Sequence, residues 1–427
     1  MRSVIIQVAG LGHELVTQHA DLFEKLPHAF HPITPSFPAV TCSAQATFRT
    51  GLPCEQHGMV ANGVFFREPA TVEFWNQSAR LIHGERLWKE AQKNGQSVGL
   101  MFWQQSLGED VSLLLSPAPI HKHHGGMIQD CYSKPTQLYP RLCERLGRKF
   151  NLMNYWGPLA SKKSSDWICD ATCAVLDDEN LRTDILLTYL PHLDYILQKR
   201  GPNPDKTLRK HVSKTVSLLS RIIDSAKCQG YEVLIWGDYA ITEARKVVFP
   251  NRILKNAGLF LERRVDGRSY PDLYASRAIA VADHQVAHVY VRNSRDIAET
   301  RKVLEQTEGV ENVLARPDGA HPNYGDLCLV AEEHAWFAYP WWDTDGRVKP
   351  PDFATHVDIH NKIGFDPCEL FWGRLFPPGV SLDCSTVKGT HGRANHPTAY
   401  MSTVPLISDP ICIEDLARIL MRQSTVE

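Results

Sequence analysis

The sequence predicts an α/β fold in which helices cover both faces of a mainly parallel β-sheet. Short apolar runs alternate with stretches of helical periodicity along the chain, which is typical of repeated strand–helix–strand units. The apolar runs also lack the polar–apolar alternation of strands with one wet face, and this favours strands that are buried on both sides. In such sheets the functional side chains gather just beyond the carboxyl ends of the strands.

Each element follows from its local pattern. The longest predicted helix covers residues 206–227, because Val212, Val216, Leu219 and Ile223 recur at helical spacing. Apolar runs bounded by turn residues predict strands at residues 4–8, 97–102, 184–190 and 232–236. Two further helices are predicted at residues 15–26 and 85–93.

The stretch from residue 245 to 385 has a different character. Strands are predicted at residues 279–281, 289–291 and 326–331 and a helix at residues 298–306, and loops rich in Trp and Pro follow. We interpret this stretch as an inserted α+β region packed over the sheet, which leaves residues 1–244 and 386–427 as the core domain. The aromatic run at residues 336–342 is interpreted as core of the insertion rather than as a platform for base stacking.

Composition limits the function classes. The chain has 427 residues, of which 43% are hydrophobic and 22% charged, as in an ordinary globular protein. The net charge is −2 and the sequence contains no basic stripe, so a nucleic acid polymer is not an expected partner. No apolar run is long enough to span a bilayer and the first residues lack a signal-peptide pattern, so no membrane association is expected. The eleven scattered cysteines are interpreted as reduced thiols of a cytoplasmic protein.

The most informative segment runs from Phe37 to Asn62. It places Thr41 between an extended Phe-Pro approach and a predicted helix, and a Thr-Gly step, a His-Gly turn and Asn62 follow. Backbone N–H groups and the helix dipole favour a bound anion at a helix N-terminus, so a hydroxyl there is placed to attack phosphorus. Taken alone, Thr41 is more typical of a helix cap and Asn62 of a turn. The whole run favours the functional interpretation.

This run resembles the nucleophile segment of the type I phosphodiesterase/nucleotide pyrophosphatase branch of the alkaline phosphatase superfamily. The shared pattern is Phe-Pro-x-x-Thr, then Thr-Gly with a following Pro and His-Gly, then Val-x-Asn. The resemblance implies a three-layer α/β/α sandwich of the alkaline phosphatase type, with a smaller α+β insertion over the active face. It also implies that Thr41 is the nucleophile and that Asn62 steadies a phosphoryl oxygen.

The same resemblance implies a centre of two zinc ions with ligands from four motifs. Three ligand positions are kept, by Asp194 after the third predicted strand, Asp238 after the fourth, and His391 in a late Gly-Thr-His-Gly. The other three ligand positions hold Ala9, Gln198 and Tyr239. Gln is a weak neutral ligand, Tyr rarely binds zinc, and Ala cannot bind it at all.

Three interpretations of this incomplete ligand set stay open. The site holds one divalent ion tightly, or two weakly, through Asp194, Asp238, His391 and Thr41, with zinc favoured over manganese or magnesium. Alternatively, other side chains replace the missing ligands, or the site is inactive and is kept as a binding pocket. We favour the first two together. The replacement ligands considered are His192, Asp283, His284, His356, Asp358 and His360.

Most of these side chains also have a structural interpretation. Aspartates that follow strands, such as Asp194 and Asp238, are commonly helix caps or turn residues. The histidine-rich segment from His121 to Gly126 is interpreted as a solvated loop rather than as a cationic rim for a substrate. Histidines on strands more often complete hydrogen-bond networks than bind metal, and this interpretation is favoured for His284, His288, His356 and His360.

Together these residues predict an enzyme that hydrolyses a phosphodiester or pyrophosphate bond in a small phosphorylated substrate. Thr41 would form a phospho-threonine intermediate, and bound metal would activate it. Two alternatives remain: a phosphomonoesterase or phosphonate hydrolase of a biosynthetic pathway, and a non-catalytic binding protein on a degenerate hydrolase scaffold. In the resembled family an aromatic residue after the nucleophile helps to hold a nucleotide base, and Cys42 in that place weakens a nucleotide substrate. The oligomeric state stays open.

Overall fold

The centre of the molecule is an eight-stranded β-sheet. A computed structural model describes residues 2–124, 126–343, 348–358, 361–374, 378–404 and 406–425 of the chain. From one edge of the sheet to the other, the strands are β2 (His31–Ile33), β22 (Thr398–Ser402), β11 (Glu232–Gly237), β1 (Ser3–Val8), β10 (Ile185–Leu190), β5 (Val98–Met101), β6 (Leu113–Pro117) and β9 (Cys131–Lys134).

The strands in the middle of the sheet, from β11 to β6, are parallel, as the alternation of strands and helices predicted. The strands at the two edges, β2, β22 and β9, run antiparallel to their neighbours, so the sheet is mixed rather than purely parallel. Parallel strands end at the same edge of a sheet. The residues that follow β1, β10 and β11 therefore meet at one edge, where the candidate site lies.

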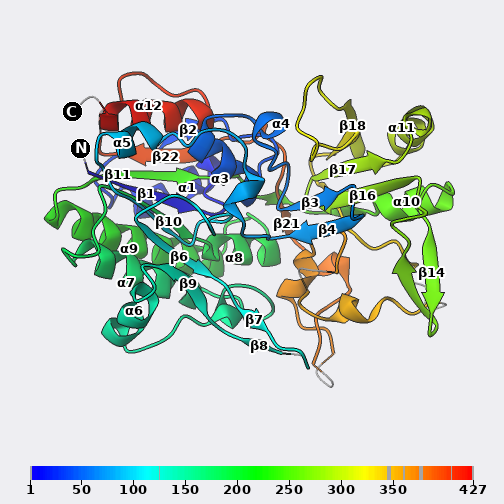
Figure 1. Cartoon of the computed structure of the whole chain (residues 1–427), viewed down its shortest axis with the longest axis horizontal. Helices are drawn as coiled ribbons and strands as arrows, with labels where there is room; N and C mark the ends of the chain where they lie inside the picture. The colour runs from blue at the N-terminus through cyan, green and yellow to red at the C-terminus, as the bar shows by residue number, and fades with distance from the viewer. Residues whose placement is uncertain are drawn as a thin grey trace.

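Helices cover both faces of the sheet, which confirms the three-layer α/β/α sandwich (Figure 1). Helix α9 (Lys206–Cys228) begins where the Asp205 carboxylate accepts a hydrogen bond from the Leu208 N–H at 2.6 Å, a typical N-terminal cap. One face carries α6 (Leu138–Leu146), α7 (Lys163–Leu176), α8 (His192–Arg200) and α9 (Lys206–Cys228), and the other carries α3 (Thr41–Thr50), α5 (Lys89–Lys93) and α12 (Ile413–Thr425).

Two predicted helices are shorter than expected. Residues 15–26 form two separate helices, α1 (His13–Gln18) and α2 (Ala20–Phe23). Between them the backbone of His19 leaves the helical region (φ −124°, ψ 31°), and its Nδ1 bonds with the carbonyl oxygen of Leu15 at 3.1 Å. Ahead of α5, the Arg86 guanidinium donates to the carbonyl oxygens of Ile82 and Gly84, and this turn replaces the first part of the predicted helix.

A second, smaller sheet lies in the stretch that was predicted to be inserted. Phe337, Trp341 and Trp342 are buried in the core beneath it, which confirms the interpretation of the aromatic run. The division into a core of residues 1–244 and 386–427 and an insertion of residues 245–385 stays a prediction. The antiparallel sheet has the order β16 (Ala278–Asp283), β17 (Val286–Val291), β19 (Leu327–Ala331) and β18 (Val310–Ala315), and α10 (Pro250–Asn256) and α11 (Ile297–Glu305) accompany it (Figure 1, right).

A hairpin from the N-terminal part of the chain packs with this second sheet (Figure 1). Its strands are β3 (Gly63–Phe66) and β4 (Thr71–Phe74). Phe65 and Phe74 belong to the same buried apolar cluster as the side chains of β16 and β17. The second sheet is therefore anchored to the segment that directly follows Asn62.

The remaining elements are short. The helix α4 (Cys54–His57) follows α3, and the hairpin of β7 (Ile120–His121) and β8 (Met127–Ile128) extends from the central sheet. The other two-stranded pairs are β12 (Thr242–Glu243) with β21 (Gly389–Thr390), β13 (Lys246–Val248) with β20 (Ala335–Phe337), and β14 (Glu262–Val265) with β15 (Arg268–Pro271). Single 3₁₀ turns occur at Ala79–Leu81, Leu152–Asn154, Ser294–Asp296, Asp352–Thr355, Pro367–Leu370 and Cys384–Thr386.

Three sequence predictions concern features outside the site. In the described ranges, no helix combines the length and the apolar character needed to cross a bilayer. All eleven cysteines are free thiols. Residues 121–124 are exposed at the tip of the β7–β8 hairpin, which confirms the solvated loop.

Candidate active site

Thr41 is the first residue of α3. The preceding residue, Val40, is extended (φ −136°, ψ 154°), so the chain turns from extended to helical at Thr41, as the sequence predicted. The Ala39 N–H donates to the carbonyl oxygen of Gly392 at 2.9 Å, which joins this segment to the late Gly-Thr-His-Gly motif. Thr41 is only 3% exposed, so its hydroxyl is held almost wholly inside the protein.

The hydroxyl of Tyr239 lies between Thr41 and Asp194. Thr41 Oγ1 donates to Tyr239 Oη at 3.4 Å, and Tyr239 Oη donates to Asp194 Oδ1 at 3.1 Å. Tyr239 follows β11, and Asp194 lies in the first turn of α8 after β10. These two strands flank β1, so the common edge of the sheet brings the groups together. Burial raises the pKa of Tyr239 well above its ordinary value, and the neutral phenol can both accept and donate a hydrogen bond.

Asp194 is held by amide and phenol donors. Gln198, one helical turn further along α8, donates its Nε2 to both carboxylate oxygens of Asp194, at 2.9 and 2.8 Å. Asp194 is 6% exposed, and burial raises its pKa to about 6 in spite of the hydrogen bonds from Gln198 and Tyr239. The carboxyl group of Asp194 therefore changes its charge close to neutral pH.

Asp238 is tied to the edge of the sheet in a similar way. Its Oδ2 accepts a hydrogen bond from Gln7 Nε2 at 2.7 Å, and its Oδ1 accepts from the backbone N–H groups of Gly10 at 3.1 Å and Tyr239 at 3.0 Å. Gly10 follows Ala9, the residue that stands where the resemblance implied a ligand. Burial raises the pKa of Asp238 to about 8, in spite of the hydrogen bonds from Gly10 and Gln7.

His391 joins the site from the C-terminal part of the chain. Its Nδ1 lies 2.8 Å from the carbonyl oxygen of Ala39, which can only accept, so Nδ1 carries the proton and Nε2 keeps its lone pair. Nε2 is 3.9 Å from Asp194 Oδ1, and burial lowers the pKa of His391 to about 3. The close approach depends on Gly389, because a Cβ there would stand 2.2 Å from the carbonyl oxygen of Leu197 in α8.

Two aromatic rings pack against the ring of His391. The ring of Tyr239 lies parallel to it, with 3.6 Å between centroids and 3° between planes. The ring of His284 lies 3.7 Å away between centroids and is tilted by 35°, and His284 in turn contacts Phe365 at 4.2 Å between centroids. His284 therefore belongs to the site, as a stacking partner whose pKa is lowered by burial.

Asn62 is hydrogen bonded to both the nucleophile segment and the second sheet. Its Oδ1 accepts from the Cys42 N–H at 3.0 Å, while its backbone N–H and its Nδ2 donate to the two carboxylate oxygens of Asp283 at 2.7 and 3.2 Å. An amide nitrogen carries two N–H groups, so Asn62 has a second one to offer. Burial raises the pKa of Asp283 to about 7. Asp283 is thus a support for Asn62 rather than a replacement metal ligand.

The side chains at this site do not fit a zinc centre. Among the described residues, no three His, Cys, Asp or Glu side chains come together in a way that could hold a metal ion. Gln198 and Tyr239 direct N–H and O–H groups at the carboxylate of Asp194, so these two positions supply hydrogen-bond donors where the resemblance implied metal ligands. The Asp238 oxygens receive three further donors. The predicted zinc ligands lie near one another, but they make hydrogen bonds with other groups of the protein.

The other predicted ligands lie elsewhere or serve other purposes. His192 faces α9, where its Nε2 is 3.3 Å from Thr215 Oγ1 and burial lowers its pKa to about 3. His288, which was not among the ligands considered, bonds with the carbonyl oxygen of Val60 at 3.1 Å, in agreement with the hydrogen-bond network favoured for it. His356 is exposed and bonds with a carbonyl in its own turn. Asp358 lines a separate pocket. His360 lies outside the described residues.

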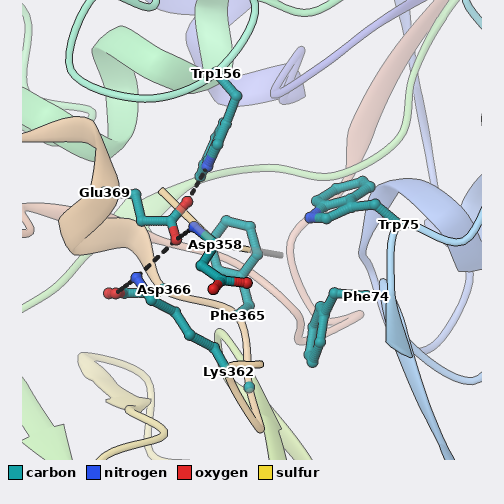
Figure 2. Close-up of a pocket in the computed structure, with 9 residues that line it drawn as sticks. Phe74, Trp75, Trp156, Asp358, Lys362, Phe365, Asp366 and Glu369 are labelled. Carbon is teal, nitrogen blue, oxygen red and sulfur yellow. Dashed lines mark hydrogen bonds and ion pairs between the residues drawn. The ribbon is translucent and has the colours of Figure 1, made fainter. Parts of the chain in front are cut away.

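Figure 2 shows that pocket. It connects to the site at two points. Phe365 in its wall contacts His284, and the Trp75 N–H donates to the carbonyl oxygen of Asn62 at 3.0 Å. The pocket occupies about 240 Å³ including its open mouth. It is lined by Phe74, Trp75, Trp156, Asp358, Lys362, Gly364, Phe365, Asp366 and Glu369.

Sequence reasoning missed the bridging role of Tyr239 and the support from Gln7. It treated Tyr239 as a lost ligand, although a phenol can take part in proton transfer as well as in packing. The only signal for Gln7 was a polar residue inside an apolar strand, since a buried amide needs hydrogen-bond partners.

Comparison with known proteins agrees with this architecture. The type I phosphodiesterase / nucleotide pyrophosphatase family model matches residues 4–366. None of the curated proteins compared matches the chain. Phosphonoacetate hydrolase from Sinorhizobium meliloti 1021 has a similar fold, with a TM-score of 0.66 and 13% identity over 100% of this chain and 96% of that one. Murine ectonucleotide pyrophosphatase / phosphodiesterase 5 has a TM-score of 0.61 and 14% identity over the same shares. The chain therefore belongs to the type I phosphodiesterase / nucleotide pyrophosphatase family, with the fold of the alkaline phosphatase superfamily.

Proposed function

We propose that this protein hydrolyses a phosphoric ester bond of a small substrate, most simply a phosphodiester or pyrophosphate, with Thr41 as the nucleophile. The observation that carries the proposal is the hydrogen-bonded chain from Thr41 through Tyr239 to Asp194. A hydroxyl is a poor nucleophile until a base takes its proton. Asp194, with a pKa of about 6, is ionised at neutral pH and is placed to take that proton through the phenol.

The reaction would run in two steps. In the first, Thr41 Oγ1 forms a bond to phosphorus, the bond from phosphorus to the leaving oxygen breaks, and the Thr41 proton passes through Tyr239 to Asp194. In the second, water attacks the phospho-threonine and the bond from Thr41 Oγ1 to phosphorus breaks. Thr41 then regains its proton from Asp194 by the same path, and the proton released by water balances the charge of the leaving oxygen.

Two groups would stabilise the negative charge that develops on the phosphoryl oxygens. The Asn62 side chain is held next to the residue after Thr41, because its Oδ1 accepts from the Cys42 N–H, and the second N–H of its amide would donate to a phosphoryl oxygen. The N-terminus of α3 adds the positive end of its dipole. Preorganised donors of this kind commonly contribute more to catalysis than any other single group.

The metal that the resemblance implied is not part of this proposal. Members of such families are typically dependent on divalent metals, but in this chain Gln198 and Tyr239 supply the donors at Asp194. The cytoplasmic location also stays a prediction, which rests on the free thiols.

The test is an assay of the purified protein after treatment with EDTA, with residual metal measured. Bis-(p-nitrophenyl) phosphate, p-nitrophenyl phosphate and a phosphonate ester distinguish the substrate classes. We expect turnover that survives metal removal, is lost in Thr41→Ala, and is partly kept in Thr41→Ser. Turnover that disappears with the metal and returns with zinc would contradict the proposed proton path.

A second candidate function is the binding of a phosphorylated ligand without turnover. The observation in its favour is that three of the implied ligand positions hold Ala9, Gln198 and Tyr239, and that the kept carboxyl groups are fully engaged within the protein. A protein inert toward all three substrates that still binds inorganic phosphate or vanadate, with the affinity lost in Asn62→Ala, would support this function instead.

A further inference from the structure

The turn between β16 and β17 places a histidine in an unusual backbone conformation. Asp283 pairs with Val286, so His284 and Gln285 form a two-residue hairpin turn. The first residue of this turn, His284, has a φ of 56°, in the left-handed region. Gly is the usual residue at such a position, because a side chain there crowds the backbone. Other residues keep such conformations where the surrounding structure enforces them, and these places cluster at functional sites.

The side chain of His284 is also buried without a hydrogen bond to its Nδ1. The residue is 2% exposed, and within the described part of the chain no group bonds with this nitrogen. The ring contacts that it does make are with the rings of His391 and Phe365. A buried polar atom without a partner costs free energy, and such atoms are rare in folded proteins. A glycine in this turn would avoid both costs.

The residues on either side of His284 are bonded to the site. The carboxylate of Asp283 accepts from the backbone N–H and the Nδ2 of Asn62, at 2.7 and 3.2 Å. The backbone N–H of Gln285 donates to the carbonyl oxygen of His391 at 2.8 Å. The turn is therefore fixed at the site from both sides, and the ring between these two anchors lies against His391.

We propose that the ring N–H of His284 donates a hydrogen bond to an oxygen of a phosphate or phosphoryl group bound at the Thr41 site. An imidazole carries an N–H group in each of its charge states, so this role does not depend on a change of charge. One turn of the second sheet would then act on the phosphoryl group twice, through Asp283, which holds Asn62, and through His284 itself. The part of His284 in catalysis rests on the proposed function, whereas its binding of a tetrahedral oxyanion does not.

Two other roles of this ring make different predictions. If His284 only stacks on His391, a phenyl ring would serve equally well. If His284 binds zinc as a replacement ligand, loss of the imidazole would lower the metal content of the protein. The donor role alone predicts that loss of the ring nitrogens weakens the binding of phosphate in a protein free of metal.

The test replaces His284 with phenylalanine, which keeps a ring in this place and removes both ring nitrogens. Binding of inorganic phosphate is measured by calorimetry after EDTA treatment, and stability by unfolding in urea. We expect the affinity for phosphate to fall about tenfold, as for the loss of one hydrogen bond to a charged group. The urea midpoint should stay the same or rise, because a buried nitrogen without a partner is removed. An unchanged affinity in His284→Phe, or no binding of phosphate by the wild type, would overturn the inference.

Two variants control for the fold. His288→Phe makes the same substitution in the same hairpin, where the Nε2 of His288 bonds with the carbonyl oxygen of Val60. This control should lower the urea midpoint and leave the affinity for phosphate unchanged, and equal losses of affinity in the two variants would contradict a direct contact. His284→Asn keeps an N–H donor in a residue that tolerates a positive φ, so it should recover part of the affinity.

Further arms separate this binding from the chemistry. His284→Phe should lower kcat/KM for bis-(p-nitrophenyl) phosphate by about 10²–10³, the usual effect of removing one donor to a developing oxyanion. In a Thr41→Ala background, His284→Phe should weaken phosphate binding as it does in the wild type. Phosphate binding that depends on His284 in a protein without turnover would support the donor role and refute the proposed enzyme. Zinc that is bound by the wild type and lost in His284→Phe would overturn the inference in favour of a metal ligand.

Discussion

Replacing Tyr239 with phenylalanine tests the proposed proton path most directly. Tyr239→Phe keeps the ring that stacks on His391 and removes only the hydroxyl that links Thr41 to Asp194. General-base catalysis contributes about 10²–10⁴ to a rate. At 1.36 kcal/mol for each tenfold change, the expected loss in kcat/KM corresponds to about 3–5 kcal/mol of transition-state stabilisation.

The expected effect on stability is smaller. The variant loses the long hydrogen bond from Thr41 and the hydrogen bond to the Asp194 carboxylate, which still receives both contacts from Gln198. A hydrogen bond to a charged group contributes about 1.5–3 kcal/mol to folding. The free energy of unfolding from urea titration and kcat/KM for bis-(p-nitrophenyl) phosphate should therefore fall by different amounts.

A matched control lies at the other end of the same strand. Tyr231 precedes β11, is buried, and donates its hydroxyl hydrogen bond to the carbonyl oxygen of Thr183 at 2.6 Å. Tyr231→Phe should lower the free energy of unfolding by about 0.5–1.5 kcal/mol, as expected for a hydrogen bond to a neutral carbonyl, and leave kcat/KM unchanged. If Tyr239→Phe retains wild-type turnover while Thr41→Ala does not, or if both tyrosine variants lose activity equally, the reasoning about the phenol is refuted.

Four further outcomes are expected. Because Asp194 accepts a proton only when ionised and its pKa is raised to about 6, kcat/KM should rise tenfold per pH unit below pH 6 and level off above it; a flat profile would contradict its role as base. Burial raises the pKa of Asp238 from 3.8 to about 8, so the contribution of this carboxyl group to stability is complete below pH 3.8 and is lost as pH rises through 8. The free energy of unfolding in urea should therefore fall between pH 6 and pH 9 by less in Asp238→Asn than in the wild type. The double variant Gln198→His, Tyr239→His should retain about one zinc ion per chain after dialysis, measured by mass spectrometry. An equal zinc content in the wild type would contradict the claim that the carboxylates of the site bind protein donors instead of a metal ion. Arg49→Met should lower the free energy of unfolding in urea by about 3 kcal/mol, because Arg49 is fully buried and donates to three backbone carbonyl oxygens; a change below 1 kcal/mol would show that these bonds contribute little.

Much of the scaffold was predictable because its signals are local. The apolar runs that form β1, β10 and β11 and the helical periodicity of α9 are visible in short windows of sequence. The break at His19 was not predicted, because it depends on a side chain that bonds back to the carbonyl of Leu15. The antiparallel edges were also missed, since strand direction depends on which neighbour a strand finds in space.

The sequence by itself determined the family, the order of strands and helices, and the placement of Thr41 at the start of a helix, because short motifs and periodic patterns carry that information. Only the tertiary structure decided what stands around the Thr41 hydroxyl. Tyr239 is 198 residues away along the chain, and it reaches Thr41 because parallel strands end at the same edge of the sheet. The same folding directs Gln198 and Tyr239 at the Asp194 carboxylate, so the groups that read as lost ligands are hydrogen-bond donors in the folded protein.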